Sequence, residues 1–211
     1  MESDTPSGTS QNDSPELDAL LDTAWEAAQA GVRESRHGWH QATIASNGPD
    51  GIPEVRTVVL RSADPETRSM GFHTDARSGK IVHFETDGRV GLLLYDRAQR
   101  IQLRARGMAT VHRNDALADA AWARSSLSSR RCYLAPHAPS KVLPVFSPNL
   151  PEDLLHHVPD EATLEAGREH FALVRCRLEM LEWLHLRHDG HVRARFQWDE
   201  AGVCSACWLA P

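Results

Sequence analysis

The chain reads Arg56-Thr57-Val58-Val59-Leu60-Arg61, then Phe72-His73-Thr74, and then Ser78-Gly79-Lys80. Apolar residues typical of β-strands fill the first two segments, between cationic and hydroxyl side chains. The third segment is typical of a helix start, where free backbone N–H groups and the helix dipole favour an anion. This stretch therefore predicts strands beside a helix N-terminus, arranged to hold a planar ligand that carries a phosphate.

The rest of the chain predicts several antiparallel strands and few helices. We expect helices over residues 15–31 (after a Ser14 N-cap), 78–85 and 114–123, and strands over residues 41–46, 54–62, 70–74, 89–95, 100–112, 171–186, 191–198 and 203–209. Asp189-Gly190 lies between two alternating runs and indicates a β-hairpin, whereas the Pro-rich stretch 136–159 indicates an irregular loop. Because helices do not alternate with strands as in βαβ folds, the expected fold class is mainly β, an antiparallel barrel with peripheral helices.

Length and charge narrow the class of protein. The 211 residues suffice for one well-buried domain and are few for two. Residues 1–13 have no aromatic or branched apolar side chain, which predicts a disordered tail before a domain over 14–211. A net charge of −6 argues against a nucleic-acid surface. There is no apolar run of about 18 residues and the start is acidic and polar, so we expect a cytoplasmic protein without a signal peptide.

The order and spacing of these elements resemble the flavin-binding signature of the pyridoxamine 5′-phosphate oxidase-like family. The resemblance extends over residues 17–211 and is strongest at 53–110 and 171–211. Tyr133-Leu134-Ala135-Pro136 and Pro139-Ser140 resemble a bacterial subgroup whose substrates are unassigned. The resemblance implies an antiparallel split β-barrel that binds FMN non-covalently, and a homodimer with two flavins at the subunit interface.

The resemblance also implies which residues hold FMN. The implied flavin contacts are Arg56, Thr57, Val58, Val59, Leu60, Arg61, His73, Thr74, Ser78, Lys80, Gln102, Ser140, His185 and Arg195. Gly79 stands where the family motif has an arginine, and Arg77 could supply the missing phosphate contact. Successive strand residues face opposite sides, so the arginines at 56 and 61 serve one group only if a β-bulge intervenes.

The closing hairpin carries the implied substrate contacts, His191 and Arg193, which share a strand face with Arg195. Their order is exchanged relative to the Arg and His of pyridoxamine phosphate oxidases. His185 stands where the family has a flavin-contacting Trp, and Trp183 lies two residues earlier on the same face. We therefore expect that the protein is not an efficient pyridoxamine 5′-phosphate oxidase and that it uses another small anionic or polar substrate, or another electron donor.

The family's remaining contacts to the substrate phosphate would fall around Trp122, Arg124 and residues 128–131, without a residue-by-residue match. The leading prediction is an FMN-dependent oxidoreductase. Two other functions stay open, a non-catalytic flavin carrier or sensor and a haem-handling split barrel with a histidine ligand to iron.

Other kinds of site are not expected. Cys204 and Cys207 form a C-x-x-C, but a terminal strand would point them to opposite faces. The 12 histidines include no H-E-x-x-H, and neither G-x-S-x-G nor G-x-G-x-x-G occurs. We expect no metal site, no nucleic-acid partner and no membrane partner.

Overall fold

The computed structural model describes residues 15–211, so the predicted tail over 1–13 and the Ser14 cap lie outside the described residues. The helices are α1 (Pro15–Arg33), α2 (Gly79–Thr86), α3 (Ala116–Arg124), α4 (Leu127–Arg130) and α5 (Glu161–Glu165), with 3-10 turns η1 (Arg131–Leu134), η2 (Glu152–Leu154) and η3 (Arg168–His170). The strands are β1 (Gln41–Asn47), β2 (Pro53–Asp64), β3 (Ser69–Asp75), β4 (Arg89–Asp96), β5 (Ile101–His112), β6 (Phe171–His185), β7 (Val192–Trp198) and β8 (Cys204–Trp208). Every predicted strand is present, with small shifts at the ends.

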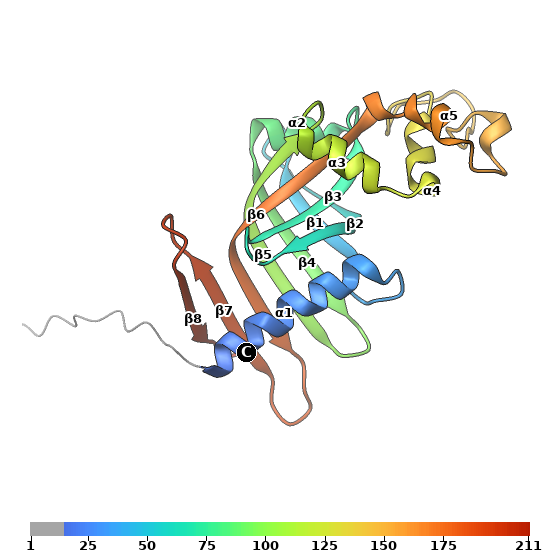
Figure 1. Cartoon of the computed structure of the whole chain (residues 1–211). Helices are drawn as coiled ribbons and strands as arrows, with labels where there is room; N and C mark the ends of the chain where they lie inside the picture. The colour runs from blue at the N-terminus through green and yellow to red at the C-terminus, as the bar shows by residue number, and fades with distance from the viewer. Residues whose placement is uncertain (1–14) are drawn as a thin grey trace, which may run out of the picture.

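The strands form one antiparallel sheet in the order β3-β2-β1-β4-β5-β6-β7-β8. Strand β3 also pairs with β6, which closes β1 to β6 into a barrel. Figure 1 shows β7 and β8 continuing the sheet away from the barrel, with α1 lying across both parts. The predicted antiparallel split barrel is confirmed. Among residues 15–211, no helix is long and apolar enough to cross a membrane.

The barrel closes because apolar residues alternate along its strands. Leu92 and Leu94 of β4 and Leu103 of β5 point inward and are buried, whereas the residues between them face outward. Trp39 is 1% exposed and meets the ring of Trp183 edge-on at 5.9 Å. Burying such side chains contributes about 1.5–3 kcal/mol each. The same alternation assigns the polar residues of β5 to the outside of the barrel.

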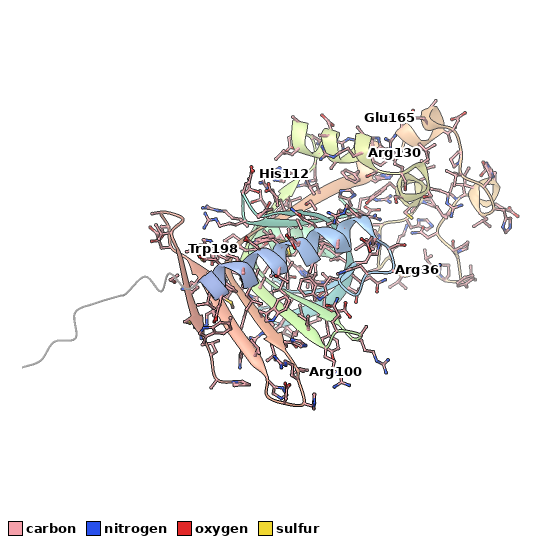
Figure 2. All side chains as sticks on the ribbon, turned by 60° about the horizontal axis from the view of Figure 1, so that its bottom comes forward. Arg36, Arg100, His112, Arg130, Glu165 and Trp198 are labelled. Atoms are coloured by element: carbon pink, nitrogen blue, oxygen red, sulfur yellow. The ribbon has the colours of Figure 1, made fainter. Side chains whose placement is uncertain are left out.

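The helical layer at one end of the barrel was only partly predicted. The short helices α4 and α5 and the turns η1 and η3 were not expected, whereas 136–159 is largely irregular as predicted. This layer has its own small core around Trp122 and Phe171, whose rings lie 5.4 Å apart. Arg130 is buried there and donates to Glu161 at 2.9 Å, and Figure 2 shows Arg130 among these helices.

One predicted boundary is wrong. We expected Gly31 to end the first helix, but α1 continues to Arg33. A Cβ on Gly31 would lie 2.7 Å from the carbonyl oxygen of Trp39. The glycine is therefore needed for close approach of the following segment, and it is not the helix C-cap.

Candidate functional site

The two arginines of strand β2 expected to contact FMN, Arg56 and Arg61, lie in different parts of the structure. Arg56 pairs with Ile44, a fully buried residue, so its side chain starts on the inner side of the sheet. The register between β2 and β3 shifts between Leu60 and Ser62, so Arg61 lies at a β-bulge, but this bulge does not bring Arg61 to the same cavity as Arg56. Arg61, by contrast, lines a cavity outside the barrel. The two cations therefore belong to different clusters.

The first cluster, called here the Lys80 cluster, lies where α2 covers the end of the barrel. The ammonium Nζ of Lys80 donates to Thr74 Oγ1 at 3.0 Å and to Ser78 Oγ at 2.7 Å. Ser78 occupies the N-cap position of α2, but its hydroxyl makes no bond to the helix backbone. Arg56 completes the cluster and donates to Ser46 Oγ at 2.5 Å.

The charges of the Lys80 cluster favour an added anion. Burial, and then the positive charge of Arg56, lower the pKa of Lys80. Within residues 15–211, Lys80 makes no ion pair with a carboxylate, and its partners are neutral hydroxyls. Arg56 is paired with Glu54 at 2.7 Å, so the positive charge of the cluster that has no carboxylate partner is that of Lys80. This ammonium and two hydroxyls near a helix N-terminus suit a phosphate group.

Arg77, which was expected to replace the arginine missing at Gly79, is bound within its own chain. Its guanidinium donates to Asp75 at 3.0 and 2.7 Å and to the Ala135 carbonyl at 2.9 Å. The hydrogen bond with Asp75 raises the pKa of Arg77. Arg77 therefore holds the helical layer to β3, and its contact with a phosphate stays a prediction. No atom lies within 4 Å of a Cβ built on Gly79, so this position is open.

The second cluster surrounds a cavity of about 310 Å³, called here the Arg61–Arg124 cavity. Its lining residues are Arg61, Arg124, His73, Ser62, Ser125, Ser126, Ser129, Val32, Ala121 and Leu173. None of these carries a carboxylate. The sequence indicated Arg61 and His73, and it indicated substrate contacts around Arg124 and residues 128–131, which include Ser129. It did not indicate Ser62, Ser125 and Ser126.

His73 is uncharged in this cavity near neutral pH. Burial first, and then the charges of Arg61 and Arg124, lower the pKa of His73 to about 4. The ring lies 4.7 Å from that of Phe171, and its Nδ1 is 3.4 Å from the hydroxyl of Ser125. The neutral imidazole therefore forms a wall of the cavity beside two permanent cations.

The shifted pKa makes stability depend on pH. Between its ordinary value near 6.5 and about 4, the unfolded chain takes up a proton that folded His73 does not. The free energy of unfolding therefore falls as pH drops through this window, by about 2–3 kcal/mol from this residue. His73→Gln should remove that part of the slope in urea unfolding at pH 7, 5.5 and 4. His188→Gln, at a side chain that is 92% exposed, is the control. Parallel slopes for His73→Gln and the unmodified protein would contradict the assignment.

Gln102 and Arg195, both expected at the flavin ring, share one side of the sheet with Leu184 and Arg193, and this side is called here the outer face. Gln102 of β5 pairs with Leu184 of β6, which pairs with Arg193 of β7. Arg195 lies two residues further along β7 on the same side. His185 pairs instead with Ile101 and Val192, whose side chains have the opposite direction. The outer face thus contains Leu184 rather than His185 beside Gln102.

The other residues expected to contact FMN or substrate are either exposed or paired within the chain. Ser140 lies exposed in the loop after η1, with a φ of 66°. His191 is exposed just before β7, and its Nδ1 accepts from the backbone N–H of Arg187 at 3.1 Å. Arg193 donates to Glu182 at 3.1 and 2.7 Å, so this expected substrate contact is paired within its own chain.

The Lys80 cluster and the outer-face residues lie at opposite ends of the barrel. The N–H of Ala109 bonds the carbonyl of Gly88, just after α2 ends. Gln102 is seven residues away along β5, a distance of about 23 Å. Figure 1 shows α2 at one end of the barrel and the β4–β5 turn, next to Gln102, at the other. One chain therefore does not bring Gln102 and Lys80 to a common point.

Part of this chain is similar to a known protein family. Residues 16–113, which include β2, β3, α2 and Gln102, match the model of the pyridoxamine 5'-phosphate oxidase FMN-binding domain. Over these residues the chain is similar to the pyridoxamine 5′-phosphate oxidase-like family, and the observed split barrel agrees with that similarity. FMN is the cofactor that this family domain indicates. A search of curated protein sequences gave no significant match.

Solved structures share the fold of this pyridoxamine 5′-phosphate oxidase-like protein. A pyridoxamine 5'-phosphate oxidase-related FMN-binding protein from Nostoc punctiforme is 21% identical, with a TM-score of 0.69 over 94% of this chain and 98% of that one. PhzG from Burkholderia lata is 20% identical, with a TM-score of 0.68 over 98% of each chain. At this identity the likeness shows a common split barrel.

Two groups of residues have the chemistry that FMN needs, one suited to its phosphate and one suited to its ring. The Lys80 cluster offers an unpaired ammonium and hydroxyls to a phosphate. On the outer face, the Nε of Arg195 is buried without a hydrogen-bond partner among residues 15–211. A buried donor of this kind is costly unless a ligand completes its bonding.

Proposed function

We propose that this protein is an FMN-dependent oxidoreductase that takes a hydride from a small anionic substrate. The observation that carries the proposal is the Arg61–Arg124 cavity, which offers two guanidinium groups and four hydroxyls with no lining carboxylate. Its volume of about 310 Å³ suits a small molecule. Arg61 also ends the strand segment expected to hold FMN, so a substrate in this cavity would lie beside the flavin.

Each part of the cavity has a role in this proposal. Bound FMN supplies the acceptor for the hydride. Arg61 and Arg124 bind the substrate anion through charge-assisted hydrogen bonds. The hydroxyls of Ser125 and Ser129 orient it, and the neutral ring of His73 adds no third charge. Leu173 and the other apolar lining residues exclude water from one side.

The substrate class is proposed as a carboxylate or phosphate ester other than pyridoxamine 5′-phosphate. PhzG from Burkholderia lata was solved with tetrahydrophenazine-1-carboxylic acid, which supports a carboxylate-bearing substrate for this fold. Here His191 and Arg193 are exchanged relative to the oxidases, and Arg193 is paired with Glu182. Discrimination for the B6 substrate should therefore be poor.

The test is anaerobic reduction of the FMN-loaded protein by pairs of donors that differ only in one anionic group. The anionic member should bleach the visible flavin band with a KM at least about tenfold lower, since a charged hydrogen bond contributes about 1.5–3 kcal/mol. Arg124→Ala should remove most of this preference and leave reduction by the neutral donor unchanged. Turnover of pyridoxamine 5′-phosphate should stay below about 1 per second. Bound FMN that no donor reduces would favour a carrier over an enzyme.

We also propose that the flavin site is completed in a symmetric homodimer. The Lys80 cluster and the outer face of one chain lie apart, so a second copy would bring them together. The outward side of the barrel also exposes apolar residues, with Val55 66%, Leu93 36% and Tyr95 44% exposed. These side chains support an interface there.

A further inference from the structure

A buried carboxylate lies among the arginines of the outer face. Glu182 of β6 is only 6% exposed. Its Oε1 accepts from Arg193 Nε at 3.1 Å, from the second nitrogen of that guanidinium at 2.7 Å, and from Arg104 at 3.2 Å. Burying an ionised carboxylate is costly unless it is paired and hydrogen-bonded. Two arginines from the neighbouring strands satisfy this requirement.

The register shows that the pairing is selective. Glu182 lies directly opposite Arg104 on β5 and directly opposite Arg195 on β7. Its ion-pair partner on β7 is nevertheless Arg193, two residues before Arg195 in the chain. Arg195 makes no ion pair within residues 15–211, and its buried Nε has no partner. Glu182 therefore pairs with two of these three cations, offsets one unit of their positive charge, and leaves Arg195 without an ion-pair partner.

We propose that Glu182 is a positioning residue that fixes Arg104 and Arg193 and so sets the positive charge offered to the flavin ring by Arg195. This inference rests on the proposed FMN function for its redox consequence. The pairing itself is a property of the chain without FMN. Reduced flavin carries negative charge on its ring, so the net charge of this face decides how strongly reduced FMN is held relative to oxidised FMN.

The first test uses the protein without FMN. Urea unfolding of Glu182→Gln, Arg193→Gln and the double variant gives a double-mutant cycle. We expect the double variant to be more stable than the sum of the two single losses predicts, because each single change leaves a buried charge or donor unpaired. Additive losses would overturn the pairing, whether or not the protein binds FMN.

The second test measures the midpoint potential of bound FMN against a redox dye. Glu182→Gln removes a negative charge, so reduced FMN should bind about tenfold more tightly relative to oxidised FMN, a rise of about 30 mV for a two-electron couple. Glu182→Asp keeps the charge and should restore a potential near that of the unmodified protein. Arg193→Gln should shift the potential downward, which keeps the proposal testable if Glu182→Gln does not fold.

The matched control is Glu179→Gln, an exposed carboxylate on the same strand that makes no ion pair within residues 15–211. Its removal should shift the potential less, because an exposed charge is screened by water. Equal shifts for Glu179→Gln and Glu182→Gln would overturn the positioning role. Failure of every variant and of the unmodified protein to bind FMN would instead refute the proposed function, and the unfolding cycle would still decide the pairing.

Discussion

Replacing Lys80 with alanine is expected to weaken FMN binding by about 10- to 100-fold and to leave riboflavin binding nearly unchanged. A charge-assisted hydrogen bond contributes about 1.5–3 kcal/mol, and about 1.4 kcal/mol corresponds to a tenfold change in Kd. Riboflavin has no phosphate for the ammonium to meet. Quenching of flavin fluorescence during titration of the FMN-free protein measures both constants. Equal losses for the two ligands would show that Lys80 does not contact the phosphate.

Two further variants test whether Lys80 contacts the phosphate: one is a control and the other adds a cation. Arg36→Ala removes an exposed cation from the loop between α1 and β1, as Figure 2 shows, and should leave both constants unchanged. Gly79→Arg adds a guanidinium where the space around the Cβ is open, and it should strengthen FMN binding selectively. Weaker FMN binding by Gly79→Arg would place the phosphate elsewhere.

The same Lys80 variant tests the shared site. If one chain supplies the Lys80 cluster and its partner supplies the outer face, subunits carrying Lys80→Ala and Arg195→Ala should complement each other. A mixed dimer would then have one intact site and one doubly damaged site. Flavin content after co-refolding measures this, and mixed dimers that bind no better than either parent would refute a site shared between subunits.

The substitution Gly107→Ala is expected to destabilise the protein by more than about 3 kcal/mol and to leave much of it unfolded. A Cβ on Gly107 would lie 1.9 Å from the backbone oxygen of Arg177 and 2.9 Å from the Cα of Leu178. These are atoms of the neighbouring strand at the β5–β6 bulge, so no side-chain rotation relieves the clash. The barrel can accept the methyl group only by separating two of its strands.

Gly91→Ala is the matched control, because Gly91 lies on the adjacent strand β4 and pairs with Arg106. The nearest atom to its added Cβ is the Cβ of Ala45 at 3.8 Å, an ordinary contact. We expect a change within about 0.5 kcal/mol for this variant. Urea unfolding of both proteins without FMN measures the difference in stability. Similar unfolding midpoints would show that β5 and β6 can separate at the bulge with little loss of stability.

Local patterns were sufficient to predict most of the fold. The alternation of apolar residues in β4 and β5 is a property of neighbouring residues, and it indicated both strands and the inward side of each. The turn around Asp189-Gly190 likewise depends on adjacent residues, and Gly190 has the positive φ of 122° that glycine favours. The resemblance added the expectation that residues 56–61 and Lys80 hold FMN, and the family match over 16–113 covers these positions.

The sequence by itself thus predicted the strands and the barrel class, because periodicity and short motifs are local, and its resemblance to a known family indicated FMN. Only the tertiary structure decided the partners of the charged groups. Arg77 meets Ala135 across 58 positions and Arg104 meets Glu182 across 78, contacts that depend on strand order and helix placement. A change of one residue in register reverses every side chain of a strand, and the bulge at Gly107 sets which of Leu184 and His185 shares a face with Gln102. No local pattern contains that register, because it is fixed by packing between distant segments.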